Sequence, residues 1–452
     1  MKNIDLVVIG GGPSGQIVAT TAKRQHPEKS VAIITEKKDG LVPCGIPYIF
    51  NDLGSCESNH TDATGIVALN GELIIDEVTN VDTKSKTVKL LSGEKILFDK
   101  LVFATGSKPI YPTFIPGHEL EGVDVIAKDY EAMDILKTKI DNATNVVVVG
   151  AGFIGCEVSE QISKTGKKVT LIEALPNILS KSFSEKVSES AERVLTELGV
   201  TLKLGQKVKE IREESGLVKT VVLENGEEIP ADSVIFSIGY KPNVAVAKDA
   251  GISLDDFGFI KVDSYMRTNI KDIYAVGDCS STVGFITGKM DNIMLASTGT
   301  AEARILGYNI YNINLLRSFR GTLGIFSTKI GGVTYTCAGA NEKTAEDAGI
   351  DYVVGKFMGI DRHPGKFSDT SRIFIKLVAS PSSGQVIGAE IWGSHSAGEL
   401  INIVGMAIQN EVTIYDLLTY QIGTHPLLTG PPTGYAIIKA ADDIFNKINF
   451  RK

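Results

Sequence analysis

The sequence predicts an α/β fold that contains two similar parallel-sheet domains and a third, α+β domain at the C-terminal end. Its 452 residues are enough for about three domains of ordinary size. A pattern of strand, glycine turn, helix and strand, closed by an acidic residue, occurs twice. From Arg317 onward this pattern gives way to strand-like segments and one amphipathic helix.

The composition is that of a soluble globular protein, with 43% hydrophobic and 22% charged residues. The net charge of -8 gives no electrostatic reason to expect nucleic acid or an anionic membrane as a partner. No apolar run reaches the roughly 20 residues of a membrane-spanning helix, and the N-terminus has no signal-peptide segment. Neither the cysteines nor the histidines have metal-ligand spacing. We therefore expect a cytoplasmic protein without a metal.

Residues 4–36 contain the first copy of the repeated pattern. The strand IDLVVIG runs into a glycine turn and a helix, and the strand VAIIT then leads to Glu36. The spaced glycines are Gly10, Gly12 and Gly15. The first permits a tight turn, the second lets the backbone approach a pyrophosphate, and the third lets helix and strand pack closely.

Residues 145–173 contain the second copy. The strand NVVVVG runs into Gly150, Gly152 and Gly155, and the strand KVTLIE ends on Glu173. The helix N-terminus suits phosphates, and the final acid suits a ribose hydroxyl. Because Glu173 would repel a 2'-phosphate, NADH is favoured over NADPH. Two complete copies predict two Rossmann-like dinucleotide-binding domains with an electron path between their ligands.

Further segments carry a resemblance to a known family. In chain order they are the turn at 10–15, CGIPY at 44–48, ATG at 104–106, the segment 150–157, GYKPN at 239–243, YAVGD at 274–278 and HP at 425–426. With them the whole chain resembles the flavoprotein pyridine nucleotide-disulfide oxidoreductases. The resemblance is to their single-cysteine branch, which contains coenzyme A disulfide reductases, persulfide reductases and NADH oxidases.

The resemblance implies that the first glycine turn binds FAD and the second binds NADH. Asp278 would bond the ribityl chain, Phe153 would be the aromatic gate over the flavin, and Glu157 the acid beside it. Phe153 could instead be core at the start of a helix. The residues implied in cofactor binding are Gly10, Gly12, Gly15, Glu36, Thr105, Gly106, Gly150, Gly152, Phe153, Gly155, Glu157, Glu173, Gly277 and Asp278.

Cys44 is the candidate nucleophile. Pro47 suits the first turn of a helix, which places Cys44 near a helix N-terminus, and this position is expected to lower its thiol pKa. A thiolate there could attack a disulfide or persulfide sulfur. The positions five before and five after Cys44 are Asp39 and Ile49, so an internal disulfide of the CxxxxC type is not expected.

The catalytic intermediate on Cys44 would therefore be a mixed disulfide, a persulfide or a sulfenic acid. A buried structural cysteine is the alternative interpretation of this residue. Of the remaining cysteines, Cys56 is expected in a surface loop, and three are expected in the core: Cys156, Cys279 and Cys337.

A proline-rich stretch after Gly106 predicts the first domain boundary. We expect FAD-binding parts at 1–112 and 245–320, an NAD-binding domain at 113–244, and a C-terminal domain at 321–452. That last domain contains the strands GTLGIFSTKI, SRIFIKLVAS and QVIGAEIWG, and a helix at 400–410. In the resembled family it builds a homodimer and lends residues to the partner's active site.

Tyr420 and His425 are the candidates for acid–base work in that domain. A histidine could protonate a leaving thiolate at neutral pH, and a tyrosine hydroxyl could stabilise it. No acid follows His425 closely, so a structural turn is the alternative for this residue.

Three functions remain open at this stage. The first is NADH-dependent reduction of a small disulfide or persulfide, with coenzyme A as the leading carrier. Lys23 and Arg24 on the first helix could meet its phosphates, or they could form a solvated helix face. The second is an NADH oxidase working through a sulfenic acid on Cys44, which is disfavoured because Pro13 and Ser14 stand where many oxidases of the resembled family carry a histidine. The third is a flavin redox sensor.

Overall fold

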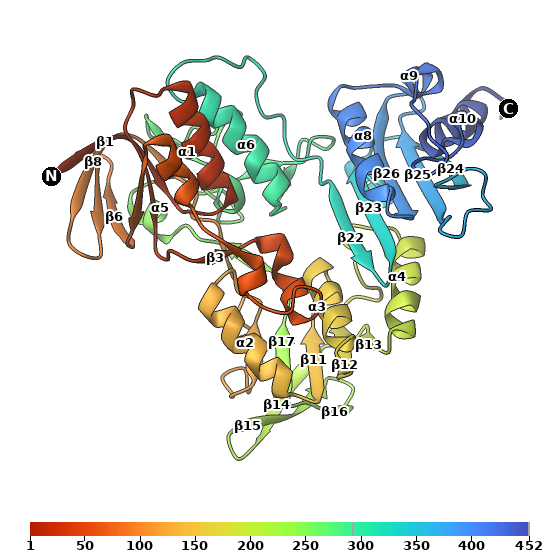
Figure 1. The fold of residues 1–452 in the computed structure, drawn as a ribbon, viewed down its shortest axis with the longest axis horizontal. Helices are drawn as coiled ribbons and strands as arrows, with labels where there is room; N and C mark the ends of the chain where they lie inside the picture. Colours follow the sequence, from red (N-terminus) through yellow and green to blue (C-terminus); the bar gives the residue numbers. More distant parts are fainter. Residues whose placement is uncertain (292, 451–452) are drawn as a thin grey trace.

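The computed structural model describes residues 1–291 and 293–450. Figure 1 shows two α/β parts, one red to orange with green segments returning to it and one yellow to light green, and a C-terminal part in cyan and blue. Each part is built on one main sheet. We call these the first, second and third sheet in chain order.

The first sheet is mainly parallel, because the buried Val and Ile runs of its central strands are covered on both faces. Its helices α1 (Pro13–Gln25) and α6 (Ala296–Asn309) pack against each other. A late strand, β19, pairs with β8, so the chain returns to this sheet after leaving the second one. The strands are β5 (Glu72–Ile75), β2 (Val31–Thr35), β1 (Lys2–Ile9), β8 (Lys95–Phe103), β7 (Thr87–Leu90), β6 (Val78–Asp82) and β19 (Ile273–Ala275).

An irregular segment between β2 and β5 carries Cys44. Two short strands pair there, and three 3₁₀ helices flank them. These elements are β3 (Gly40–Leu41), η1 (Pro43–Phe50), η2 (Glu57–Asn59), β4 (His60–Thr61) and η3 (Thr64–Leu69).

The second sheet is fully parallel and has three helices around it. Its strands in spatial order are β10 (Val123–Val125), β17 (Ser233–Phe236), β11 (Asn145–Val149), β12 (Lys168–Glu173) and β13 (Thr201–Leu204). The helices are α2 (Tyr130–Asn142), α3 (Phe153–Ser163) and α4 (Glu185–Glu197). A separate antiparallel sheet contains β14 (Val208–Glu214), β15 (Leu217–Leu223) and β16 (Glu228–Pro230).

The two connections between the first and second sheets run side by side. The outgoing strand β9 (Ser107–Pro109) pairs antiparallel with the returning strand β18 (Tyr240–Pro242). The short helix α5 (Ala245–Asp249) then packs against β6. A later hairpin pairs β20 (Thr282–Val283) with β21 (Met290–Asp291).

The third sheet is antiparallel. Its strands in spatial order are β22 (Phe326–Ile330), β23 (Val333–Gly339), β26 (Val386–Gly393), β25 (Arg372–Ala379) and β24 (Val353–Ile360). Its helical elements are α7 (Glu342–Ala348), α8 (Ala397–Gln409), α9 (Ile414–Thr419), η5 (Pro432–Gly434) and α10 (Ala436–Phe450). Buried apolar residues of α8 and α10 form one core cluster with the sheet.

The predicted fold class is confirmed: two Rossmann-like α/β parts precede an α+β C-terminal part. The repeated strands lie at β1, β2, β11 and β12, and the predicted C-terminal helix begins three residues earlier than expected, at Ala397. Among the described residues no helix is long and apolar enough to cross a bilayer.

The third sheet is fastened to the second part through a buried acid. Glu390 on β26 is 1% exposed and accepts hydrogen bonds of 2.6 Å from both the backbone N–H and the hydroxyl of Ser184, the N-cap of α4. Its carboxylate also lies 2.6 Å from the ammonium of Lys376, which in turn lies 2.5 Å from Glu342.

Replacing Glu390 with alanine is expected to lower the free energy of unfolding by about 3 kcal/mol. The variant removes the partner of two part-buried donors of Ser184, while Lys376 keeps its contact with Glu342. Glu342→Ala is the matched control, because the Glu342 side chain is 32% exposed and its loss should cost about 1 kcal/mol or less. Urea unfolding of both variants measures the difference, and equal losses would contradict the argument.

Candidate active site

Both glycine turns have the backbone that a dinucleotide needs. At Gly10 (φ +113) an added Cβ would lie 2.1 Å from the carbonyl oxygen of Ala104, and at Gly15 it would lie 2.0 Å from that of Gly10. At Gly12, the N-cap of α1, a Cβ would meet no atom within 4 Å, and no side chain caps the helix. Space and free N–H groups at a helix N-terminus fit a pyrophosphate.

The second turn repeats this geometry at the start of α3. Gly150 has φ +101, Gly155 packs on the carbonyl of Gly150, and Gly152 is an open N-cap without a capping side chain. The residues present at both turns therefore fit the two dinucleotides that the sequence predicts.

The two acids after the second strands have different surroundings. Glu36 is exposed just beyond β2 and has no partner among the described residues. Glu173 accepts hydrogen bonds from the backbone N–H groups of Ala151 (2.7 Å) and Leu175 (2.9 Å). Glu173 is thus held against its glycine turn, and its role toward a ribose remains a prediction.

Asp278 lies in the turn after β19 and pairs with a lysine from the second part of the fold. Its carboxylate lies 2.6 Å from the ammonium of Lys128 and accepts a hydrogen bond of 2.7 Å from Ser107. Lys128 also lies 4.8 Å above the ring of Tyr240. The turn itself is held by Glu302, a buried carboxyl that accepts a hydrogen bond of 2.8 Å from the N–H of Gly277.

Thr105 and Gly106 form hydrogen bonds between the two chain connections that join the α/β parts. The Thr105 hydroxyl donates to the carbonyl of Asn243 (2.5 Å), and the carbonyl of Gly106 accepts from the N–H of Asn243 (2.9 Å). These bonds explain why the two residues are needed by the fold, and their contact with FAD remains a prediction.

Cys44 is the second residue of the 3₁₀ helix η1 and is the exposed cysteine among the five. The helix begins at Pro43, so Pro47 lies inside it and not in its first turn, which corrects the expected start. Close packing of Gly45 on Asn59, whose amide donates to the carbonyl of Val42 (3.0 Å), fixes this segment.

The expected lowering of the Cys44 pKa is wrong for this structure. Partial desolvation raises the pKa of the thiol, the carboxylates of Glu157 and Asp278 raise it further, and the ammonium of Lys128 opposes them. Desolvation is the main cause of the raised pKa, and the charged groups that modify it come from residues far from Cys44 in sequence.

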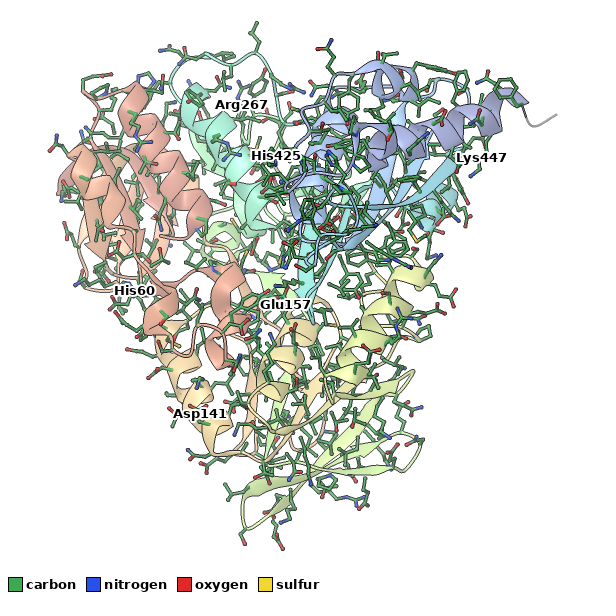
Figure 2. All side chains as sticks on the ribbon, turned by 45° about the vertical axis from the view of Figure 1, so that its right-hand side comes forward. His60, Asp141, Glu157, Arg267, His425 and Lys447 are labelled. Atoms are coloured by element: carbon green, nitrogen blue, oxygen red, sulfur yellow. The ribbon has the colours of Figure 1, made fainter. Side chains whose placement is uncertain are left out.

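Glu157 lies on α3 where the second and third sheets meet (Figure 2). Its carboxylate accepts a hydrogen bond of 2.6 Å from the hydroxyl of Thr328 on β22. Burial raises the pKa of Glu157 to about 7, and Glu160 adds to the rise, whereas the bond from Thr328 opposes it. The charge of Glu157 contributes to the raised pKa of both Tyr48 and Cys44. A carboxyl with a pKa near neutral whose charge acts on an exposed thiol is a candidate for proton transfer.

Glu157→Gln is expected to change how stability depends on pH. The folded pKa of about 7 lies above the ordinary value of 4.5, so the folded protein keeps a proton that the unfolded chain releases between these pH values. Stability from this group is present below pH 4.5 and is lost as pH rises through 7, by on the order of 3 kcal/mol. Glutamine lacks this loss and can still accept the bond from Thr328.

Urea unfolding from pH 4.5 to 8 measures this effect as the difference between wild type and Glu157→Gln. Burial raises the pKa of Glu302 to about 8, but that carboxyl is present in both proteins and cancels in the difference. A difference that stays constant with pH would contradict the raised pKa of Glu157.

Phe153, the first residue of α3, is half-buried in an aromatic cluster. Its ring stacks on Phe326 (centroids 4.9 Å apart, planes at 9°) and meets Phe183 edge-on at 5.8 Å. The position beside the second glycine turn is compatible with the predicted gate, and the packing is compatible with the core alternative. The gate remains a prediction.

Within one chain, Tyr420 and His425 are not joined to Cys44 or Glu157 by any hydrogen bond, ion pair or ring contact among the described residues. Tyr420 lies just after α9, with its ring 6.4 Å from that of Tyr435. His425, labelled in Figure 2, accepts a hydrogen bond at Nδ1 from the N–H of Leu427 in an exposed turn. A role at the thiol would need a partner subunit.

Two further sequence expectations are corrected. Cys56 was expected in a surface loop but is fully buried, because η2 folds its side chain into the core that η1 shares with the second part. Lys23 is buried and donates to the carbonyls of Pro27 and Lys29, so it is unavailable to a phosphate, whereas Arg24 is exposed. The core placement of Cys156, Cys279 and Cys337 is confirmed.

Sequence reasoning missed Lys128, Ser107, Glu302 and Thr328. Each acts on a partner between 22 and 171 positions away along the chain, and none sits in a glycine or cysteine motif. Lys128 directly precedes Asp129, the N-cap of α2. This capping residue is the one local sequence signal near Lys128. No group of three or more His, Cys, Asp or Glu in the described ranges could hold a metal.

Two family models match the chain. Residues 4–303 match the model described as pyridine nucleotide-disulphide oxidoreductase, and residues 325–433 match its dimerisation domain. The chain is 30% identical to an NADH oxidase of Enterococcus faecalis, with 91% of this chain and 93% of the relative covered. It is 31% identical to an NAD(P)H coenzyme A polysulfide/persulfide reductase of Pyrococcus horikoshii, with 86% and 87% covered.

A solved structure with the same fold is that of an NAD-dependent persulfide reductase from A. fulgidus. It superposes with a TM-score of 0.90 at 30% identity and covers 98% of this chain and 83% of the other. The similarity therefore extends over both glycine turns, the Cys44 segment and the third sheet.

Proposed function

We propose, from the premise that this chain belongs to the pyridine nucleotide-disulphide oxidoreductase family, that it uses NADH to reduce a low-molecular-weight disulfide or persulfide. At the coarser level it is an FAD- and NAD(P)H-dependent oxidoreductase. The observation that carries the finer proposal is the single exposed thiol of Cys44, whose charged neighbours Glu157 and Asp278 come from the two parts of the fold that hold the glycine turns.

The assignment of cofactors follows the two turns. The turn at Gly10 would hold FAD, with Glu36 free to accept from a ribose hydroxyl, and Asp278 would face the ribityl chain once its bond with Lys128 rearranges. The turn at Gly150 would hold NADH. The carboxylate of Glu173 next to that turn supports NADH over NADPH, because it would repel a 2'-phosphate.

In the proposed reaction Cys44 does the sulfur chemistry. Its sulfur, as thiolate, attacks one sulfur of the substrate, the S–S bond breaks, and one thiol leaves with a proton, so that a mixed disulfide forms on Cys44. FAD, when bound, supplies the electron pair taken from NADH. Two electrons and a proton then release the second thiol and regenerate the Cys44 thiolate. For a persulfide substrate, hydrosulfide is one of the two products.

Proton transfer is assigned to groups around the thiol. Glu157 is the candidate acceptor of the Cys44 proton, because its pKa of about 7 lets it change protonation state near neutral pH and its charge acts on the thiol. The match to the dimerisation domain supports a homodimer in which Tyr420 or His425 of the partner subunit protonates the leaving thiol.

Coenzyme A disulfide or persulfide is the leading substrate. The P. horikoshii relative supports this choice by its name, and the exposed Arg24 remains able to meet a phosphate after Lys23 is excluded. Reduction of O₂ is the second candidate, because the E. faecalis relative is an NADH oxidase.

The test compares electron acceptors on the purified holoenzyme. NADH oxidation is measured anaerobically with coenzyme A disulfide and with coenzyme A persulfide, and separately with O₂ while an oxygen electrode records consumption. The proposal expects a kcat/KM for a sulfur acceptor at least about tenfold above that for O₂. Oxygen consumption that accounts for all NADH oxidised, at a rate above that of either sulfur acceptor, would establish the oxidase instead.

A further inference from the structure

A cavity of about 500 Å³ lies between α4 of the second part and one end of the third sheet, away from both glycine turns and from Cys44. We call it the α4 pocket. Figure 1 shows α4 beside the ends of β22 and β23. Its volume is in the range of small-molecule sites, and its walls come from two parts of the fold, which is where such sites often form.

The floor of the α4 pocket is aromatic. Phe374 and Trp392, directly paired across β25 and β26, stack with ring centroids 5.2 Å apart and planes at 11°. Both side chains are half-buried, and Trp392 is the one tryptophan of the sequence. Two parallel rings standing on a sheet offer a flat apolar surface on which a further planar ring can stack.

The walls of the pocket are basic. Lys186 and Arg193 lie seven residues apart on one face of α4, and Arg372 faces them from the start of β25. Throughout the described residues none of these three cations has a carboxylate within ion-pair distance. Glu189 is the single acid among the lining residues.

These three cations gather in one pocket of a chain whose net charge is -8. Unpaired cations on two facing walls attract an anion, and Arg guanidinium groups suit phosphate oxygens in particular.

We propose that the α4 pocket is a binding site for a small nucleotide-type anion, in which the aromatic ring stacks on Phe374 and Trp392 and the phosphate lies between Arg193 and Arg372. The proposal is independent of the proposed function, because no residue of the pocket belongs to the glycine turns or to the surroundings of Cys44.

Trp392 provides the readout. Holoenzyme saturated with NAD⁺, so that the dinucleotide turn is occupied, is titrated with AMP while tryptophan fluorescence is recorded. Saturable quenching is expected, with adenosine and inorganic phosphate each binding at least about tenfold more weakly than AMP. Isothermal titration calorimetry under the same conditions provides a second measurement.

The double variant Arg193→Gln/Arg372→Gln is expected to weaken AMP binding by at least about tenfold. Arg267→Gln is the matched control, because Arg267 is exposed and lies far from α4 in Figure 2. Unchanged circular dichroism and flavin content show that both proteins are folded. No saturable response up to millimolar AMP, an equal affinity in the double variant, or quenching that disappears when NAD⁺ saturates the enzyme would each overturn the proposal.

Discussion

Cys44→Ser is expected to reduce turnover of a disulfide or persulfide substrate by a factor of about 10³ or more, because the hydroxyl cannot attack sulfur or form a mixed disulfide. The loss should be in kcat as well as in kcat/KM. FAD content and reduction of the flavin by NADH should remain, since both glycine turns lie outside η1. Serine nearly matches the cysteine in size at an exposed position, so the fold should tolerate it.

Anaerobic titration with NADH distinguishes loss of the thiol from loss of the cofactor. Wild type is expected to develop a long-wavelength charge-transfer band between a Cys44 thiolate and the flavin, and Cys44→Ser is expected to lack it. Cys56→Ala is the matched control, because its buried thiol contributes packing and no sulfur chemistry. Identical spectra and turnover in wild type and Cys44→Ser would remove the thiol from the mechanism.

Gly155→Ala is expected to destabilise the protein by about 3 kcal/mol, because the new Cβ would lie 1.8 Å from the carbonyl oxygen of Gly150. That oxygen is part of a fixed turn and cannot move as a flexible side chain does. Helix propensity alone would favour alanine at this position in α3 by about 1 kcal/mol, so a net loss of stability isolates the steric effect. Urea unfolding measures it.

Gly152→Ala, in the same turn, tests cofactor binding without the steric clash expected for Gly155→Ala. Gly152 has φ -73, and its Cβ would meet no protein atom within 4 Å, so the fold should lose no more than about 1 kcal/mol. The methyl group would fill the space that a pyrophosphate needs, and the KM for NADH should rise at least about tenfold. An unchanged KM in Gly152→Ala would show that the dinucleotide does not approach this turn.

The parts of this fold that the sequence predicts well are those whose signals are local. The strands around both glycine turns follow from continuous Val and Ile runs, and each turn follows from spaced glycines that the backbone requires. The exposed thiol at Cys44 agrees with its predicted place beside Gly45.

The features that escaped prediction depend on contacts between distant segments. Cys56 is buried because η1 and η2 pack on α3 and α2, which no feature of the surrounding sequence shows. The pKa of Cys44 is raised by burial and by the carboxylates of Glu157 on α3 and Asp278 in the turn after β19, and only the assembled fold brings these groups together. The buried bonds of Lys23 likewise depend on how the chain turns at Pro27 after α1.

The contacts of Glu390 and Thr328 determine which segments of this protein can be exchanged in a chimera. The third sheet contacts the second part through two hydrogen-bonded pairs, Glu390 with Ser184 and Thr328 with Glu157. A chimera that exchanges the second part alone, to change its nicotinamide preference, would remove Ser184 as the hydrogen-bond partner of Glu390. Chimeras that exchange residues 113–244 together with the third sheet keep both hydrogen-bonded pairs, and we expect them to express as folded protein.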